Sequence, residues 1–391
     1  MIFGKTHHII DFGTSKISVA AARKNGKDVE FLGMGFCEYA GFRDGEWVAP
    51  QDLEESIYLA VKDCEQNSGK KIRKIGVVIP GEFTRSFFSN VAVRIINMDG
   101  HITENDVRNL LKEGEASLPW PDDYQLIDTK PVMYFLDGQS RRQSPVGQYA
   151  RDLEAFLSYT ASDIIFMHDI ENLLDGIGIG TEKFVPSVIS TPWLIGKNSE
   201  KTTLAIIDSG YYSTDFIIYE NGGVILHDNV PIGGYHLASD IMVKLGCDPD
   251  SAEKIKRSSI IGIDPIAADK IIVKGDEQKL SFDVEEVQYI IENRIYEISQ
   301  IMLQNIEKTG MTVDSRLGIF ITGGGISQIR GCREYMMRIL GGNVKTFKPG
   351  RPVLATAMQT SICAGLEFMI NIKDNINHMS FNRFNSKGLF N

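Results

Sequence analysis

The feature that most constrains the fold of this chain is a short phrase that occurs twice. Residues 9–15 read Ile-Ile-Asp-Phe-Gly-Thr-Ser, and residues 206–210 read Ile-Ile-Asp-Ser-Gly. In each copy an apolar strand ends in a carboxylate, Asp11 or Asp208, and a glycine two residues later permits a turn. Turns of this kind can point backbone amides outward and form anion sites. The repeat predicts two similar halves whose hairpins face one another across a cleft, with both aspartates beside a metal–phosphate complex.

Composition places the chain among cytoplasmic two-domain proteins. Its 391 residues exceed the roughly 250–300 at which a single core stops growing. A net charge of −10 argues against binding to nucleic acid, so we expect no nucleic-acid partner. The five cysteines are scattered, which favours a reducing compartment. Asp11 lies so close to the first residue that we expect no signal peptide, and no apolar run is long enough to span a membrane.

Hydrophobic periodicity predicts an α/β chain interrupted by an α+β insertion. The stretch from Phe83 to Ser162 changes character, with strand-like segments around a helix that starts near Thr103. In the second half we expect a long helix over 284–309, a buried strand over 317–322 and a last helix over 355–372. The predicted division is 1–82 and 163–202 for the first core, 83–162 for the insertion, 203–234 and 301–350 for the second core, 235–300 for a small subdomain, 351–372 for a terminal helix on the first core, and 373–391 for a flexible tail.

A triple glycine follows the strand over 317–322. Without Cβ atoms, Gly323–Gly325 could let a flat ligand approach the backbone, and a helix expected near Ser327 would add amide donors. Taken alone, the glycines also fit a tight turn with no ligand. Their position after the two Asp-x-Gly hairpins favours a ligand site.

This order of motifs resembles the actin-like nucleotide-binding superfamily, whose fold consists of two duplicated RNase H-like domains. The resemblance implies ATP as ligand, with Mg²⁺ held largely through water by Asp11 and Asp208. Lys16 would neutralise phosphate charge or merely flank its turn, and Glu253 with Lys256 would grip the adenosine or form a solvated surface pair. The implied nucleotide site comprises Asp11, Gly13, Thr14, Ser15, Lys16, Asp208, Gly210, Ser213, Thr214, Gly233, Gly234, Glu253, Lys256, Gly323, Gly324, Gly325 and Ile326.

Within that superfamily the chain is most similar to the FtsA family of bacterial cell division. The family carries an inserted module in the position of 83–162, and Ser144-Pro145-Val146-Gly147 resembles its Asn-Pro-(Val/Ile)-Gly signature. The resemblance implies an ATP-binding, filament-forming adaptor that links FtsZ to the membrane. Three alternatives remain: a pseudo-ATPase scaffold, a component of pilus assembly like PilM, and a small-molecule kinase, for which no acceptor-activating Asp stands out.

Two departures from the family pattern bear on turnover. Tyr211 and Tyr212 follow Gly210 where the family has glycines, and a tyrosine forced to positive φ costs on the order of 1 kcal/mol or more. Either the loop adopts another turn or the rings fill the space for the γ-phosphate. In addition, the connector over 189–194 has no Glu or Gln to position a water molecule. We therefore expect slow hydrolysis or none.

The resemblance also predicts partners. It places the binding surface for the FtsZ C-terminal tail on the small subdomain, where Glu292-Asn293-Arg294 resembles a Glu-Pro-Arg that starts a helix. Arg294, Lys270 and Lys274 would supply positive charge for an acidic–apolar peptide; the alternative is a solvated charged face. The tail over 373–391 lies where the family has its amphipathic membrane anchor, although its Phe and Leu do not share one helical face.

Overall fold

The first half is built on a five-stranded mixed sheet. The computed structural model describes residues 5–26, 28–97, 99–142, 144–264, 270–274 and 279–371. The strand order is β11-β6-β1-β2-β3, with β1 antiparallel to β2 and parallel to β6. These strands are β1 (Thr6–Phe12), β2 (Lys16–Asn25), β3 (Asp28–Glu38), β6 (Lys74–Ile79) and β11 (Gly180–Pro186).

The second half repeats this topology. Its order is β14-β13-β12-β17-β18, and β12 is antiparallel to β13 and parallel to β17. Asp11 and Asp208 therefore occupy equivalent places at the ends of β1 and β12. The strands are β12 (Thr203–Ser209), β13 (Thr214–Glu220), β14 (Gly223–Val230), β17 (Leu317–Thr322) and β18 (Val344–Thr346).

Both faces of each sheet are covered by helices, because successive strand residues point to opposite faces. In β1, Ile10 packs toward α1 (Leu53–Ser68) and α3 (Ile164–Gly176), whereas Ile9 packs toward α9 (Thr360–Asn371). In β12, Ile207 joins the core beneath α5 (Gly234–Leu245) and α7 (Val284–Lys308), whereas Ile206 faces α4 (Ser187–Lys197). Helices α4 and α9 pack on one another between the two sheets, so the halves meet over these helices.

The insertion forms a separate sheet covered by one helix. Thr103 starts α2 with a capping box, since Asp106 N donates to its hydroxyl and Thr103 N donates to the Asp106 carboxylate at 2.8 Å. The base of the insertion touches the second half: a Cβ on Gly223 would lie 2.7 Å from Val132 Cγ2. The order β7-β10-β8-β9 comprises β7 (Thr84–Arg94), β10 (Asp152–Asp163), β8 (Tyr124–Leu136) and β9 (Ser140–Arg142), with α2 at Glu104–Ala116.

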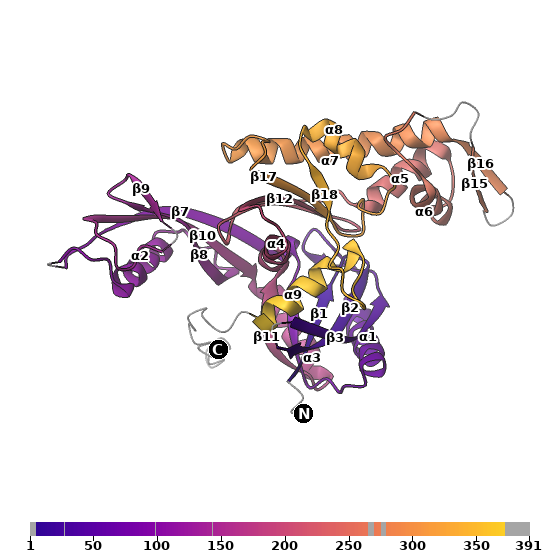
Figure 1. Cartoon of the computed structure of the whole chain (residues 1–391). Helices are drawn as coiled ribbons and strands as arrows, with labels where there is room; N and C mark the ends of the chain where they lie inside the picture. The colour runs from indigo at the N-terminus through magenta and orange to yellow at the C-terminus, as the bar shows by residue number, and fades with distance from the viewer. Residues whose placement is uncertain are drawn as a thin grey trace, which may run out of the picture.

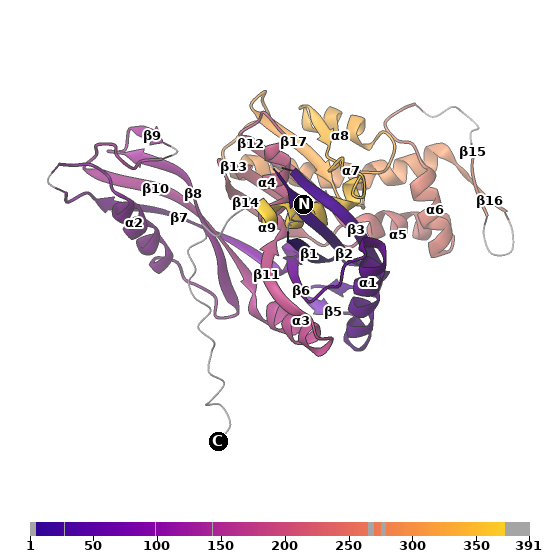
Figure 2. The same cartoon turned by 60° about the horizontal axis from the view of Figure 1, so that its bottom comes forward.

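The molecule is elongated, with the insertion and the small subdomain at opposite ends (Figures 1 and 2). The small subdomain combines α5 and the first part of α7 with further short elements. No helix among the described residues is both long and apolar enough to cross a bilayer. The remaining elements are β4 (Phe42–Arg43), β5 (Glu46–Trp47), α6 (Pro249–Ser258), β15 (Lys270–Lys274), β16 (Lys279–Asp283), α8 (Cys332–Leu340) and three 3₁₀ turns at Pro50–Asp52, Gly81–Phe83 and Ala357–Gln359.

The predicted strand over 317–322 is confirmed, and the predicted helix over 284–309 is confirmed to within one residue. The helix expected near Ser327 is wrong. Residues 327–328 form a turn and Arg330 forms an isolated bridge with Ile260, and α8 begins at Cys332 after Gly331, whose φ of 83° interrupts any earlier helix. The last helix begins at Thr360 rather than 355, because the Gln359 side chain accepts from Thr356 N at 3.1 Å and holds a separate turn.

Candidate functional site

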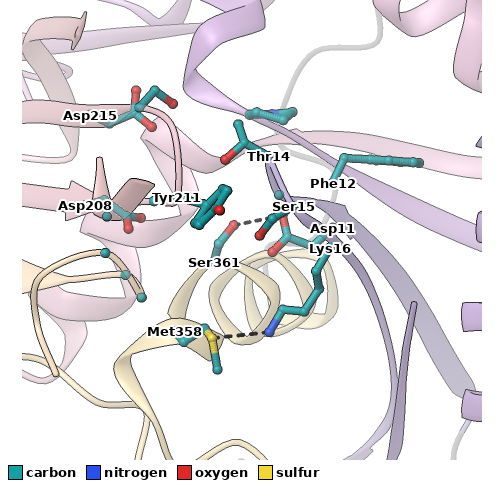
Figure 3. Close-up of a pocket in the computed structure, with 18 of the residues that line it drawn as sticks. Asp11, Phe12, Thr14, Ser15, Lys16, Asp208, Tyr211, Asp215, Met358 and Ser361 are labelled. Carbon is teal, nitrogen blue, oxygen red and sulfur yellow. Dashed lines mark hydrogen bonds between the residues drawn. The ribbon is translucent and has the colours of Figure 1, made fainter. Parts of the chain in front are cut away.

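A cavity of about 230 Å³ lies between the two halves, at the ends of β1 and β12. Asp11 and Lys16 approach it from the first half, and Asp208 and Asp215 from the second (Figure 3). The predicted site residues that line it are Asp11, Gly13, Thr14, Ser15, Lys16, Asp208, Gly210, Ser213, Gly234, Glu253, Lys256, Gly323, Gly324 and Gly325.

Three predicted site residues lie elsewhere. Thr214 is buried, and its hydroxyl donates to the Ile232 carbonyl at 2.5 Å. Gly233 lies behind the second hairpin, where a Cβ would come within 2.6 Å of the Tyr211 carbonyl. The Ile326 side chain belongs to the hydrophobic core of the second half. These residues support the cavity and do not line it.

The cavity brings several carboxyl groups together. Burial raises the pKa of Asp208 to about 8, and the charges of Asp215 and Asp11 raise it as well. Burial raises the pKa of Asp11 to about 6, although a hydrogen bond from Ser361 Oγ at 3.1 Å and the charge of Lys16 act against this. Burial also lowers the pKa of Lys16. Hard carboxylate oxygens with so little compensating charge are suited to a divalent cation.

Magnesium uses only one or two protein carboxylates and keeps most of its water. Within the described residues, no three His, Cys, Asp or Glu side chains converge as a ligand set. Asp11 and Asp208 come from opposite halves and face the same cavity. This donor set fits a hydrated magnesium ion better than a metal held entirely by protein ligands.

In each hairpin turn the amide of the glycine is engaged within the turn. Gly13 N donates to the Lys16 carbonyl at 3.0 Å, and Gly210 N donates to the Ser213 carbonyl at 2.8 Å. We expected the amides of both turns to point outward. The amides of Gly13 and Gly210 do not, because each tight hairpin closes with its own hydrogen bond, and for the other amides of the turns the expectation stays a prediction. Phosphate contacts are left to the other loop groups and to Lys16.

The tyrosines of the second hairpin are not strained. Among the described non-glycine residues, positive φ occurs at Asp44, Asp137 and Asn221, and therefore at neither Tyr211 nor Tyr212. Of the two predicted outcomes, the loop adopts another turn. Tyr211 nevertheless lines the cavity, so its ring still occupies space beside the hairpin tips.

The triple glycine serves the packing of the chain itself. A Cβ on Gly325 would lie 2.3 Å from the Gly210 carbonyl oxygen, and one on Gly323 would lie 2.3 Å from the Ser209 carbonyl oxygen. Gly325 N donates to that Ser209 carbonyl at 2.7 Å. Gly324 differs, since its Cβ would meet only the flexible Met358 side chain, at 3.1 Å. Two of the three glycines thus let the backbone of β17 approach the second hairpin.

Glu253 and Lys256 form a pair at the cavity wall. Lys256 is 5% exposed and lies 2.6 Å from Glu253, and its ammonium donates to the Gly234 carbonyl at 2.9 Å. The alternative of a solvated surface pair is therefore wrong for Lys256. Glu253 also binds Arg257 at 2.7 Å, so one carboxylate is shared between two cations on this side.

Sequence reasoning missed Glu82, Asp215 and Ser361, which also line the cavity. Glu82 accepts from Gly45 N at 2.7 Å, and burial raises its pKa. The connector α4 indeed lacks Glu and Gln, so Glu82 is an acid from a different segment that could orient a water molecule. Glu82 could have been found from its position in the sequence, because it follows Pro80 just after the end of a buried strand. Ser361 left no such local signal.

The predicted partner surface differs from expectation in the position of residues 292–294 and in the pairing of its basic side chains. Residues 292–294 lie within α7, which begins at Val284, and do not start a helix. Arg294 forms a two-pronged ion pair with Asp240, at 2.8 and 2.9 Å, and also binds Glu297. Lys270 pairs with Asp283, and the side chain of Lys274 lies outside the described part of the chain.

Two family models from bacterial cell division match parts of this chain. The family model "Cell division protein FtsA" matches residues 205–362, and "SHS2 domain inserted in FTSA" matches residues 81–159. The cell division protein FtsA of Bacillus subtilis is 24% identical over 347 residues, covering 87% of this chain and 78% of that protein. FtsA of Neisseria meningitidis serogroup B is also 24% identical, covering 87% of this chain and 83% of its own length.

Solved structures give the same fold at low identity. A PilM–PilN type IV pilus biogenesis complex matches with a TM-score of 0.60 and 14% identity, covering 93% of this chain and 96% of the matched one. MreB5 of Spiroplasma citri bound to ADP matches with a TM-score of 0.55 and 13% identity, covering 96% and 99%.

Two duplicated halves around a shared cleft, with an inserted module, define a protein of the actin-like ATPase fold, as predicted. The two family models and the relatives that match most of the chain then specify the family. The chain belongs to the FtsA family of cell-division proteins, as a divergent member.

Proposed function

We propose that this protein is a nucleotide-binding, polymerising adaptor of bacterial cell division that links FtsZ to the inner face of the cell membrane. One observation carries the proposal: in a chain of the FtsA family, two equivalent Asp-x-Gly hairpins from opposite halves enclose one cavity. An adenine nucleotide with Mg²⁺ is the ligand that best fits a glycine-rich, carboxylate-bearing cleft of this fold.

In this proposal each group has a distinct part. Asp11 and Asp208 hold the hydrated magnesium ion, whose charge relieves their repulsion. Lys16 and the Thr14 and Ser15 hydroxyls contact phosphate oxygens. The nucleoside lies against Gly324 and the Glu253–Lys256 pair. The MreB5 match supports this assignment, because that protein of the same fold is bound to ADP.

Self-association is supported by exposed apolar side chains at both ends of the molecule. Ile96 and Tyr149 are exposed on the insertion, and Ile263, Tyr289 and Tyr296 are exposed on the small subdomain. A contact between unlike ends of identical molecules repeats without closing and builds a filament. We propose that these two ends supply that contact.

The FtsZ tail would dock on the small subdomain through apolar contacts and through new ion pairs that replace existing ones. An acidic peptide would compete with Asp240 for Arg294, which lies partly exposed on α7. Membrane attachment is assigned to residues 373–391, which lie outside the described residues.

The decisive experiment measures Mg-nucleotide binding to the full chain by calorimetry, with Asp11→Ala and Asp208→Ala as variants. We expect both variants to weaken binding at least tenfold while circular dichroism stays unchanged. Unchanged affinity in both variants refutes the nucleotide site. Binding of the cognate FtsZ tail, lost on Arg294→Glu, tests the adaptor role, and an unaltered tail affinity would place the interaction elsewhere.

A scaffold that binds partners without turning over nucleotide is the second candidate. The hairpin bearing Tyr211 and Tyr212 and the absence of Glu and Gln from α4 favour it. We expect turnover far below the median of about 10 per second. Brisk phosphate release from the unaltered protein would refute this expectation and direct attention to Glu82.

A further inference from the structure

The tips of the two hairpins touch each other directly. Tyr212 N, in the second half, donates to the Thr14 hydroxyl of the first half at 3.1 Å. Thr14 lines the cavity in the same hairpin that follows Asp11 (Figure 3). The cleft is thus bridged between the loops that would hold a phosphate chain.

An arginine from the first half reinforces this bridge. Arg43, on the short β4–β5 hairpin, hydrogen-bonds to the Tyr212 hydroxyl. Its guanidinium carbon lies 3.8 Å from the centroid of the Tyr212 ring and 5.5 Å from that of Tyr235. Tyr211 packs against both of these rings, with centroids 4.8 and 5.7 Å away. Cation–π attraction therefore adds to the hydrogen bonds across the cleft.

Two backbone donors at the start of α5 are also engaged within this cluster. Gly234 N and Tyr235 N, the first two amides of α5, donate to the carbonyls of Gly210 and Tyr211 at 3.0 and 2.7 Å. An unoccupied helix N-terminus would have attracted an anion. Here the loop carbonyls take that place.

Carboxylates stand at the same end of the cavity. A Cβ on Gly81, in the first half, would lie 1.9 Å from Asp215 Oδ1, so Asp215 is pressed against the segment that carries Glu82. Asp215 accepts hydrogen bonds from His227 and Asn229, at 2.9 and 2.8 Å, which fix it there. A third phosphate entering between the tips would meet these acids, and the Arg43 guanidinium beside them is already engaged by the Tyr212 ring and hydroxyl.

We propose that the cleft selects a nucleoside diphosphate over the triphosphate, because Thr14, Tyr212 and Arg43 close the space for the third phosphate. The inference rests on the proposed nucleotide site and specifies how many phosphates its ligand carries. A triphosphate must first separate Tyr212 from Thr14.

The test compares the dissociation constants of ADP and ATP for the full chain, at equal free Mg²⁺ and ionic strength. A β,γ-imido analogue of ATP excludes loss by hydrolysis. For the unaltered protein we expect ADP to bind at least tenfold more tightly. Tyr212→Ala should bring the two constants within about threefold by strengthening ATP binding, with ADP binding nearly unchanged. Arg43→Ala, which leaves the loop intact, should shift the ratio in the same direction.

Tyr58→Ala serves as a matched control, because Tyr58 is an exposed tyrosine on α1 that does not line the cavity. Equal or tighter binding of ATP by the unaltered protein overturns the inference while leaving the nucleotide site intact. The inference is also overturned if the ratio of the ADP and ATP dissociation constants stays the same in folded Tyr212→Ala and folded Arg43→Ala. If the folded, unaltered protein binds neither nucleotide, the proposed site itself fails and the selectivity falls with it.

Discussion

Asp208 offers a direct test of the electrostatics of the cleft. Its pKa is raised from 3.8 to about 8, chiefly by burial. Between pH 4 and 8 the folded chain keeps the proton and the unfolded chain does not, so unfolding releases a proton. Stability is therefore fully present at low pH and is lost as pH rises through this window. Asp208→Asn, which imitates the protonated acid, should remove this loss.

The size of the effect follows from the shift. One pKa unit corresponds to about 1.36 kcal/mol, so a shift of about four units corresponds to roughly 5–6 kcal/mol. Water in the cleft screens part of this cost, and we expect about half of it, roughly 2–3 kcal/mol, to separate pH 4 from pH 8. For a half of some 200 residues this is roughly 4–12 °C in Tm.

The assay is thermal unfolding at pH 5 and pH 8, without nucleotide or divalent cation. Asp208→Asn should be more stable than the unaltered protein at pH 8, and the difference should shrink toward pH 4. Mg²⁺ should stabilise the unaltered protein at pH 8 more than the variant. Asp314→Asn, which changes a partly exposed carboxylate bound to Arg316, is the control and should not raise stability at pH 8. A pH dependence that survives unchanged in Asp208→Asn would refute the reasoning.

Three further predictions concern packing. Gly325→Ala places a Cβ 2.3 Å from the Gly210 carbonyl and should lower stability by about 1–3 kcal/mol in urea unfolding, whereas Gly324→Ala should be tolerated. Glu367→Gln weakens a fully buried carboxylate's bonds to Lys197 and Arg351 beside α4 and should cost about 2 kcal/mol by the same measurement. Thr103→Ala removes the capping box of α2 and should cost about 1 kcal/mol, seen as faster amide exchange in that helix.

The sequence predicted best what is encoded locally. The duplicated hairpins, the long helix α7 and the strand β17 each follow from hydrophobic period and turn residues. The helix expected near Ser327 failed because Gly331 takes a left-handed conformation before α8, which no periodicity reveals.

The cavity was predicted less completely, because it gathers residues that are distant in the chain. Ser361 donates to Asp11 across 350 positions, from a helix that shows only an apolar pattern. The partners of Arg294 were equally hidden, since Asp240 belongs to another helix. Side-chain pairing across elements depends on packing angles that a single sequence does not state.

The similarity of the two halves extends to individual hydrogen bonds. At their hairpin turns the halves therefore differ in side chains and not in the hydrogen bond that closes the turn. Gly13 N and Gly210 N each donate to the carbonyl three residues ahead, so the two turns are closed by the same backbone hydrogen bond. At the same two positions after the glycine, the first turn carries Thr14 and Ser15, and the second carries tyrosines. Because the backbone tolerates both pairs without positive φ, the aromatic tips are not required to form the turn. Their contribution lies in what they touch across the cleft, which is the hydroxyl of Thr14 and the guanidinium of Arg43.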